Sequence, residues 1–355
     1  MGLLRFILAV CVVASHTGPF LGIKWMEGSN AVVAFFIISG FYMSLILNEK
    51  YTGEKSSYGL FIGNRLLRLM PIYYTILIAH LILCGISFIC NDDALSLQGY
   101  IDHGSELHFN GWVLMIFCNL FILGQDTLYY LHLSNDNGLI WSVKDGLPTT
   151  WLILIMPAWT LSIELFFYLI APFILRVQKR IIITFILVLS LMVYCRIMGA
   201  DLGDITKSQF VSYLIYFLAG GIAWLLYKKI KQADISKSIC KIIFIIYLCC
   251  LFAFPYLFPA NEMQIQLFYV ITFLTVPFIF FLTKNWKWDA IIGEYSYPVY
   301  ITHIMVNDIL KFFGIDKAGH AALNLLITVA ISYLLIRLIA EPVERFRQMR
   351  LQKQN

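Results

Sequence analysis

The chain has 355 residues, of which 60% are hydrophobic and 13% are charged, and its mean hydropathy is +0.78. Soluble globular proteins average about 25% charged and about 45–50% apolar residues. A core of ordinary size cannot bury so much apolar side chain, so the composition excludes a soluble enzyme and indicates a membrane protein. The net charge of +5 does not indicate a nucleic-acid partner, because the basic residues cluster in short loops beside apolar segments, as in oriented membrane proteins.

Eleven apolar runs follow one another along the chain, and each is a candidate membrane span. They lie near 3–21, 29–48, 66–89, 111–124, 151–175, 181–199, 209–227, 239–258, 265–283, 293–312 and 320–340. Most basic residues fall in clusters that should share the cytoplasmic side, because cytoplasmic loops carry an excess of Lys and Arg. The opposite loops are acidic or neutral. Parity then allows only one crossing between residues 111 and 175.

The run 111–124 is shorter than the roughly 20 residues that a span needs. We expect it to be a re-entrant or interfacial segment on the outer face. The chain is therefore predicted to be an all-α integral membrane protein of about ten transmembrane helices, with both termini cytoplasmic. Residues 91–150 form an outward-facing loop region, and 1–355 form a single domain. The eight cysteines show no paired spacing, so we expect no metal site.

Polar side chains recur at one predicted depth inside the membrane, where ionisable groups are costly and usually functional. At 1.5 Å per residue, His16 lies about 16 Å from Arg5, on the same helix face. The same counting places five polar groups near the midplane of a core about 30 Å thick. These are His16, Ser39, His80, Glu164 and His303. A lone histidine can simply bond to a neighbouring helix, and this structural interpretation is favoured for His80 and His303 singly. For His16 with Glu164 a functional role is favoured, since an unpaired carboxylate is hard to tolerate there.

Arg65 and Arg68 occupy positions i and i+3 at the predicted cytoplasmic end of the third span. Two interpretations are equally open from their spacing. They are either anchors that fix membrane orientation, as most such arginines are, or a pair of guanidinium groups that bind phosphates.

Six separated motifs together resemble the membrane acyltransferase-3 family of O-acyltransferases over essentially the whole chain. They are Arg5 with His16; GSNAVVAFFIISGF, which contains Ser39; Arg65 with Arg68; WTLSIELFFY, which contains Trp159, Ser162, Glu164 and Tyr168; SYPVYITHI, which contains Tyr297 and His303; and EPVERF. Many members carry an aspartate where this chain has Ala34, so no role for that aspartate is transferred. Some members also have a fused extracytoplasmic domain, which is not expected here.

The resemblance implies a cytoplasmic acyl-CoA donor, usually acetyl-CoA, and an acceptor sugar hydroxyl that faces outward. We therefore expect acetylation of lipopolysaccharide O-antigen or another surface polysaccharide, or of a lipid-linked sugar, in a bacterial cytoplasmic membrane. Acetyl-CoA would be a substrate, with no permanently bound cofactor. Arg5, Arg65, Arg68 and Ser39 are expected to bind the donor. Trp159, Ser162, Tyr168, Tyr297 and His303 are expected on the acceptor side or as supporting residues.

A sugar hydroxyl needs a base to accept its proton, and His16 is the predicted base because imidazole titrates near neutral pH. Glu164 would orient that imidazole, or hold the acceptor. Ser39 and Ser162 are candidate oxyanion donors. An acetyl-histidine intermediate is an alternative to direct transfer. Two other functions stay open: a proton-coupled transporter or lipid-glycan flippase, and an acyltransferase of a different membrane fold.

Overall fold

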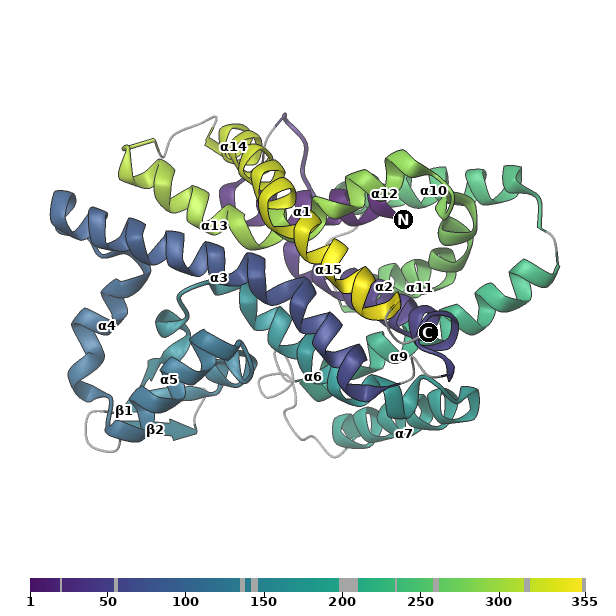
Figure 1. Ribbon diagram of the computed structural model, residues 1–355, viewed down its shortest axis with the longest axis horizontal. Helices are drawn as coiled ribbons and strands as arrows, with labels where there is room; N and C mark the ends of the chain where they lie inside the picture. The colour runs from purple at the N-terminus through teal and green to yellow at the C-terminus, as the bar shows by residue number, and fades with distance from the viewer. Residues whose placement is uncertain are drawn as a thin grey trace.

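The computed structural model describes residues 1–19, 21–53, 57–134, 138–141, 146–197, 210–233, 235–257, 262–315 and 320–352. These residues are almost entirely helical, which confirms the predicted all-α class (Figure 1). The helices are α1 (Gly2–Thr17), α2 (Gly28–Glu49), α3 (Tyr58–Asn91), α4 (Gln98–His103), α5 (Phe109–Phe121), α6 (Trp159–Ile174), α7 (Gln178–Ile197), α9 (Phe210–Gln232), α10 (Lys237–Leu257), α11 (Glu262–Thr283), α12 (Lys287–Glu294), α13 (Ser296–Phe312), α14 (His320–Leu335) and α15 (Glu341–Gln352).

Eight helical segments in the described ranges are long and apolar enough to cross a membrane. They contain α2, α3, α6, α7, α9, α10, α11 and the continuous α14–α15 unit, which includes a π-helical turn at Ile336–Ala340. The chain is therefore a multi-pass membrane protein. Helices α1 and α13 have 16 and 17 residues, and with the eight longer segments they correspond to the ten spans expected from the sequence. The sidedness of the termini stays a prediction.

Helix α7 shows how the fold meets its surroundings. Of its 20 residues only Ile181 is buried. The other side chains are mostly large and apolar, and a continuous apolar surface of this kind would be unstable in water. We conclude that α7 packs against the protein along one edge and faces lipid over most of its circumference.

Helices α2 and α9 approach each other closely at two glycines. A Cβ atom added to Gly40 would lie 1.9 Å from the carbonyl oxygen of Phe217. One added to Gly220 would lie 2.0 Å from the carbonyl oxygen of Ile37. Small residues allow membrane helices to approach in this way, and here only glycine fits at both positions.

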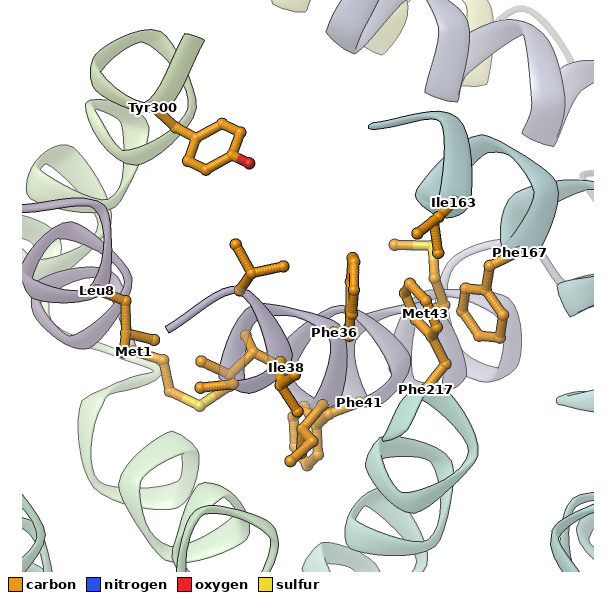
Figure 2. Close-up of a cluster of buried hydrophobic side chains, with 14 of the residues drawn as sticks. Met1, Leu8, Phe36, Ile38, Phe41, Met43, Ile163, Phe167, Phe217 and Tyr300 are labelled. Carbon is orange, nitrogen blue, oxygen red and sulfur yellow. The ribbon is translucent and has the colours of Figure 1, made fainter. Parts of the chain in front are cut away.

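Aromatic side chains fill the space beside this contact. The rings of Phe167 and Phe217 stack with centroids 4.1 Å apart, and Phe36 lies 4.7 Å from Phe217. Figure 2 shows these rings where α2, α6 and α9 meet. The stack fixes α6, whose first turns carry the WTLSIE motif, against α2.

The region between α3 and α6 forms a separate lobe, which we call the outer lobe, at the lower left of Figure 1. It contains α4, α5 and a small antiparallel sheet of β1 (Leu131–Ser134), β2 (Gly138–Trp141) and β3 (Leu147–Pro148), in the order β2-β1-β3, with Leu131 opposite Trp141. The region expected as an outward-facing loop at residues 91–150 thus contains a sheet, which the hydropathy pattern does not predict. Helix α5 has 13 residues, or about 20 Å, too short to cross a core of about 30 Å.

Helix α15, yellow in Figure 1, lies beside the first half of α3. Arg350 donates to the Oδ1 atom of Asn64 over 3.2 Å, and Leu351 is buried in the main core. The end of the chain that the structure describes is therefore packed against the arginine-bearing segment of α3.

Candidate active site

A cavity of about 820 Å³ lies between α1, α2, α3, α6, α13 and the α14–α15 unit. We call it the inner cavity. Its basic lining residues are Arg5, Lys50, Arg65, Arg68, Lys284, Arg345 and Arg347, and its acidic ones are Glu164, Asp289, Glu294, Glu341 and Glu344. The four residues expected to bind the donor, Arg5, Ser39, Arg65 and Arg68, all line it. The cavity therefore combines an excess of positive charge with an apolar wall from α2.

Glu164 is fixed in the inner cavity by two hydroxyl groups. Its Oε1 atom accepts hydrogen bonds from Ser39 Oγ at 2.5 Å and from the hydroxyl of Tyr168. Tyr168 follows Glu164 by four residues on α6, a spacing that places two side chains on one face of a helix. Ser39 reaches it from α2. The carboxylate therefore ties α2 to α6.

The cationic residues Arg5 and Arg65 are parts of the wall of the inner cavity. Arg5, in the first turn of α1, lines this cavity together with Arg68 and Glu164, so the N-terminal end of α1 forms part of its wall. Arg65 is only 5% exposed, and its guanidinium lies over the ring of Phe61 with 5.9 Å to the centroid. An isolated orientation anchor would extend its charge into water. Burial in a cavity wall instead agrees with a binding role.

His16 lies in a second cavity, of about 440 Å³, which we call the outer cavity. Helix α1 ends at Thr17, earlier than the predicted limit of 21, because Gly18 follows with φ of 92°. His16 is therefore on the last turn of the helix rather than in its interior, and its side chain is exposed. Glu27, Tyr129 and Trp159 also line this cavity.

Tyr300 and Val32 line both cavities and form the wall between them. The Tyr300 hydroxyl lies 2.8 Å from Thr160 Oγ1 and donates to the carbonyl oxygen of Pro157 over 3.2 Å. Its ring meets Phe35 edge to face, with centroids 6.2 Å apart. Figure 2 shows Tyr300 projecting from α13 into the space between α13 and α6.

Glu164 and His16 line different cavities, and within the described residues no hydrogen bond joins them. The structure does not bring them together, and a role of Glu164 in orienting the imidazole stays a prediction. The neighbour of His16 is His303, whose ring centroid lies 5.1 Å away. His303 Nδ1 lies 2.7 Å from the carbonyl oxygen of Tyr300. Since a carbonyl only accepts, Nδ1 carries the proton. Nε2 is buried without a hydrogen-bond partner.

A family model described as an acyltransferase domain, acyltransferase-3, matches residues 1–337. The chain belongs to the acyltransferase-3 family. "Putative acetyltransferase ORF330" of Acidianus two-tailed virus is 27% identical over 176 residues, which are 44% of this chain and 50% of that protein. The chain thus spans about half the length of this curated relative. No solved structure matches this chain.

Two more of the predicted site residues line the cavities. Trp159 lines the outer cavity, and its ring lies 5.5 Å from that of Tyr129. Tyr297 lines the inner cavity and donates to the carbonyl oxygen of Leu69 over 2.8 Å. Both therefore shape cavity walls, on opposite sides of Tyr300.

Ser162 lines neither cavity, and its role as an oxyanion donor stays a prediction. Its hydroxyl donates to Asp126 Oδ1 over 2.7 Å and accepts from the backbone N–H of Gly124 at 2.9 Å. Burial raises the pKa of the Asp126 carboxyl, and the bond from Ser162 opposes part of that increase. Ser162 thus links α6 to the outer lobe through hydrogen bonds.

His80 is likewise outside both cavities. Its Nε2 atom lies 2.7 Å from Ser96 Oγ and 3.7 Å from Asp308 Oδ2. It joins α3 to the outer lobe and to α13, which agrees with the structural interpretation. Among the residues that the structure describes, no group of three or more His, Cys, Asp or Glu side chains is placed to hold a metal ion.

Proposed function

We propose that this acyltransferase moves an acetyl group from cytoplasmic acetyl-CoA to a hydroxyl of an extracytoplasmic glycan. The observation that carries the proposal is the pair of cavities that share Tyr300 and Val32 as a wall. One cavity has the charge to hold a phosphorylated donor, and the other contains an accessible histidine. Lipopolysaccharide O-antigen or another surface polysaccharide is the acceptor that the family resemblance favours.

The donor would enter the inner cavity with its phosphates at the arginine-rich mouth. Arg65 and Arg68 are one helical turn apart, and guanidinium groups bind phosphate through paired N–H donors. The extended arm would then follow α2 past Ser39 towards Tyr300. This orientation places the thioester at the wall and the phosphates close to water.

The acceptor hydroxyl would enter the outer cavity beside His16. In the reaction, His16 removes the hydroxyl proton while the oxygen attacks the thioester carbonyl. A C–O bond forms, the C–S bond breaks, and coenzyme A leaves as a thiolate that takes up a proton. The hydroxyls of Thr160 and Tyr300, at the wall, join Ser162 as candidate donors to the oxyanion, to which they would turn from the Pro157 carbonyl.

The arrangement of the two cavities is also compatible with a route through an acetyl-histidine intermediate. In that route His16 attacks the thioester first, and the acceptor then attacks the acetyl-imidazole on the outer side. The two routes differ in a measurable species. Rapid acid quench of enzyme mixed with acetyl-CoA alone, followed by peptide mass analysis, should find acetyl on His16 only in the second route.

The test of the proposal uses purified protein in nanodiscs, radiolabelled acetyl-CoA and lipid-linked glycan from cells that lack the gene. We expect acetyl-CoA consumption and label in the glycan, and neither with His16→Ala. His103→Ala is the control, since His103 pairs with Glu106 in the outer lobe. Movement of an intact solute without acetyl transfer would instead indicate a transporter and overturn the proposal.

A further inference from the structure

Helix α15 brings another buried arginine to the inner cavity. Arg347 is 7% exposed and lines the cavity together with Arg65, which is 5% exposed. The family match ends at residue 337, so α15 lies beyond the matched residues. In the sequence, Arg347 lies between Arg345 and Arg350, and such a run of basic residues beside an apolar segment is typical of membrane orientation.

Both arginines have hydrogen-bonding capacity that the protein does not use. The Nε atoms of Arg65 and Arg347 are buried and have no hydrogen-bond partner. Arg347 donates through Nη1 to Glu344, which occupies one edge of its guanidinium and leaves the Nε edge free. Buried donors without partners cost free energy, so these two edges are suited to a ligand with several acceptor oxygens.

Like charges also converge at this place. Arg347 feels the repulsion of Arg65 and Arg68 from α3, with Glu344 as the attractive neighbour. Such clustering is unfavourable in the empty cavity and becomes favourable when an anion lies between the groups. The site is therefore matched to a multiply charged anion rather than to a sugar or an acyl chain.

The order of the arginines along the cavity indicates which anion. Ser39 and Glu164 are bonded to each other and lie on the proposed donor path. Arg347 lies on α15 one helical turn before Arg350, which bonds to Asn64 in the second turn of α3. Arg347 therefore lies on the side of Arg65, one turn nearer the beginning of α3 than Arg68. In coenzyme A the diphosphate follows the pantetheine arm, and the ribose 3′-phosphate lies beyond the diphosphate.

We infer that Arg347 and Arg65 bind the 3′-phosphate of the coenzyme, while Arg68 faces the diphosphate. The inference rests on the proposed function and deepens it. It makes α15 part of the donor site and makes the enzyme selective for coenzyme A over donors without the 3′-phosphate. The shared chemistry is that of a phosphate monoester, and the phosphate of an anionic lipid headgroup is a second possible source of the same contacts.

The experiment measures the affinity of acetyl-CoA and of 3′-dephospho-acetyl-CoA in phosphatidylcholine nanodiscs. The proteins are wild type, Arg347→Gln, Arg68→Gln and Arg350→Gln. Arg350 is the matched control, since it lies on α15 but bonds to Asn64 and does not line the cavity. Thermal unfolding confirms that each variant is folded.

We expect Arg347→Gln to weaken acetyl-CoA binding by roughly tenfold or more, as for a lost charge-assisted contact, and to leave the dephospho compound unaffected. Arg68→Gln should weaken both ligands, and Arg350→Gln neither. Loss of both ligands to the same degree in Arg347→Gln, or of neither, overturns the inference. The proposed function survives that result if Arg68→Gln still weakens binding, and fails if the wild type binds no acetyl-CoA.

A further arm separates the coenzyme from a lipid. Phosphatidylglycerol retained through purification is quantified by mass spectrometry for wild type and Arg347→Gln. Equal retention, with the affinity change described above, supports the coenzyme site. Loss of the lipid from Arg347→Gln without a change in acetyl-CoA affinity would show that the site holds a lipid headgroup and would overturn the inference.

Discussion

The imidazole rings of His16 and His303 lie 5.1 Å apart, with their planes inclined by 40°. His303 is fully buried and is held through Nδ1 by the carbonyl of Tyr300, whereas His16 stands in an accessible cavity. Two imidazolium groups at this distance would repel each other. The pair is thus asymmetric, with His16 free to exchange protons and His303 limiting where its ring can go.

This asymmetry predicts different defects in the two histidine variants. His16→Ala should lower acetyl transfer by about 10²–10⁴-fold, the usual contribution of a general base, with acetyl-CoA affinity unchanged. His303→Asn keeps a donor for the Tyr300 carbonyl and should lower kcat by a smaller factor. Its pH–rate profile should shift, because the neighbour of the base has changed.

Initial rates across pH 5–9 at saturating acetyl-CoA are the measurement for both variants. Near wild-type transfer by His16→Ala would remove it as the base. If the pH–rate profile of His303→Asn superimposes on that of the wild type, His303 only packs against His16 and does not influence its proton transfer.

The carboxylate of Glu164 accepts two hydroxyl hydrogen bonds. Replacing it by glutamine removes its charge while nearly preserving the size of the side chain. Glu164→Gln keeps the size and an acceptor oxygen, so the protein should fold normally and transfer acetyl more slowly by roughly tenfold or more. Acetyl-CoA affinity should not fall, since the change removes a negative charge from an anion site. Calorimetric affinity and steady-state rates test this. A large loss of affinity would show that Glu164 binds the donor.

Tyr300 forms the wall between the cavities, and its two variants should fail differently. Tyr300→Phe keeps the ring but loses the hydroxyl near Thr160, so we expect transfer to fall by about 10²-fold if it stabilises the oxyanion. Tyr300→Ala removes the ring and should raise acetyl-CoA hydrolysis relative to transfer, because water can then cross from the outer cavity. The control is Tyr247→Phe, which removes a hydroxyl that lies 3.0 Å from Thr272 Oγ1.

Hydrolysis and transfer are read from the same reaction, as free acetate and as glycan-bound label. If Tyr300→Ala leaves their ratio unchanged, Tyr300 does not separate donor from water.

Charge asymmetry and the shortness of α5 predict that both ends of the outer lobe face the same side. Single cysteines at Asp102 and Trp141 in a cysteine-free background should react with an impermeant maleimide in intact cells. A cysteine at Gln232 should react only after the membrane is opened. If the sites at 102 and 141 label from opposite sides, α5 is a true span and the ten-span topology is wrong.

The spans and the charged lining of the inner cavity were predictable from sequence, because hydropathy and charge clusters are properties of continuous segments. The pairing of His16 with Glu164 was not, because equal depth along two helices says nothing about their distance within the membrane plane. The bond between Tyr168 and Glu164 follows the i, i+4 rule and was visible in the sequence. Arg347 was missed because a basic residue at a helix end normally signals orientation.

The contact between Gly40 and Gly220 restricts how this protein can move. Carriers alternate access by rocking one helix bundle against another, and sliding α2 along α9 would drive backbone atoms into each other, since added Cβ atoms already meet carbonyl oxygens at 1.9 and 2.0 Å. We therefore expect the two helices to move as one unit, so that the side of the inner cavity lined by α2 keeps its shape. A passage between the two cavities must then open through side-chain rotation or through displacement of α13. The free-energy barrier to that opening depends on the wall formed by Tyr300 and Val32.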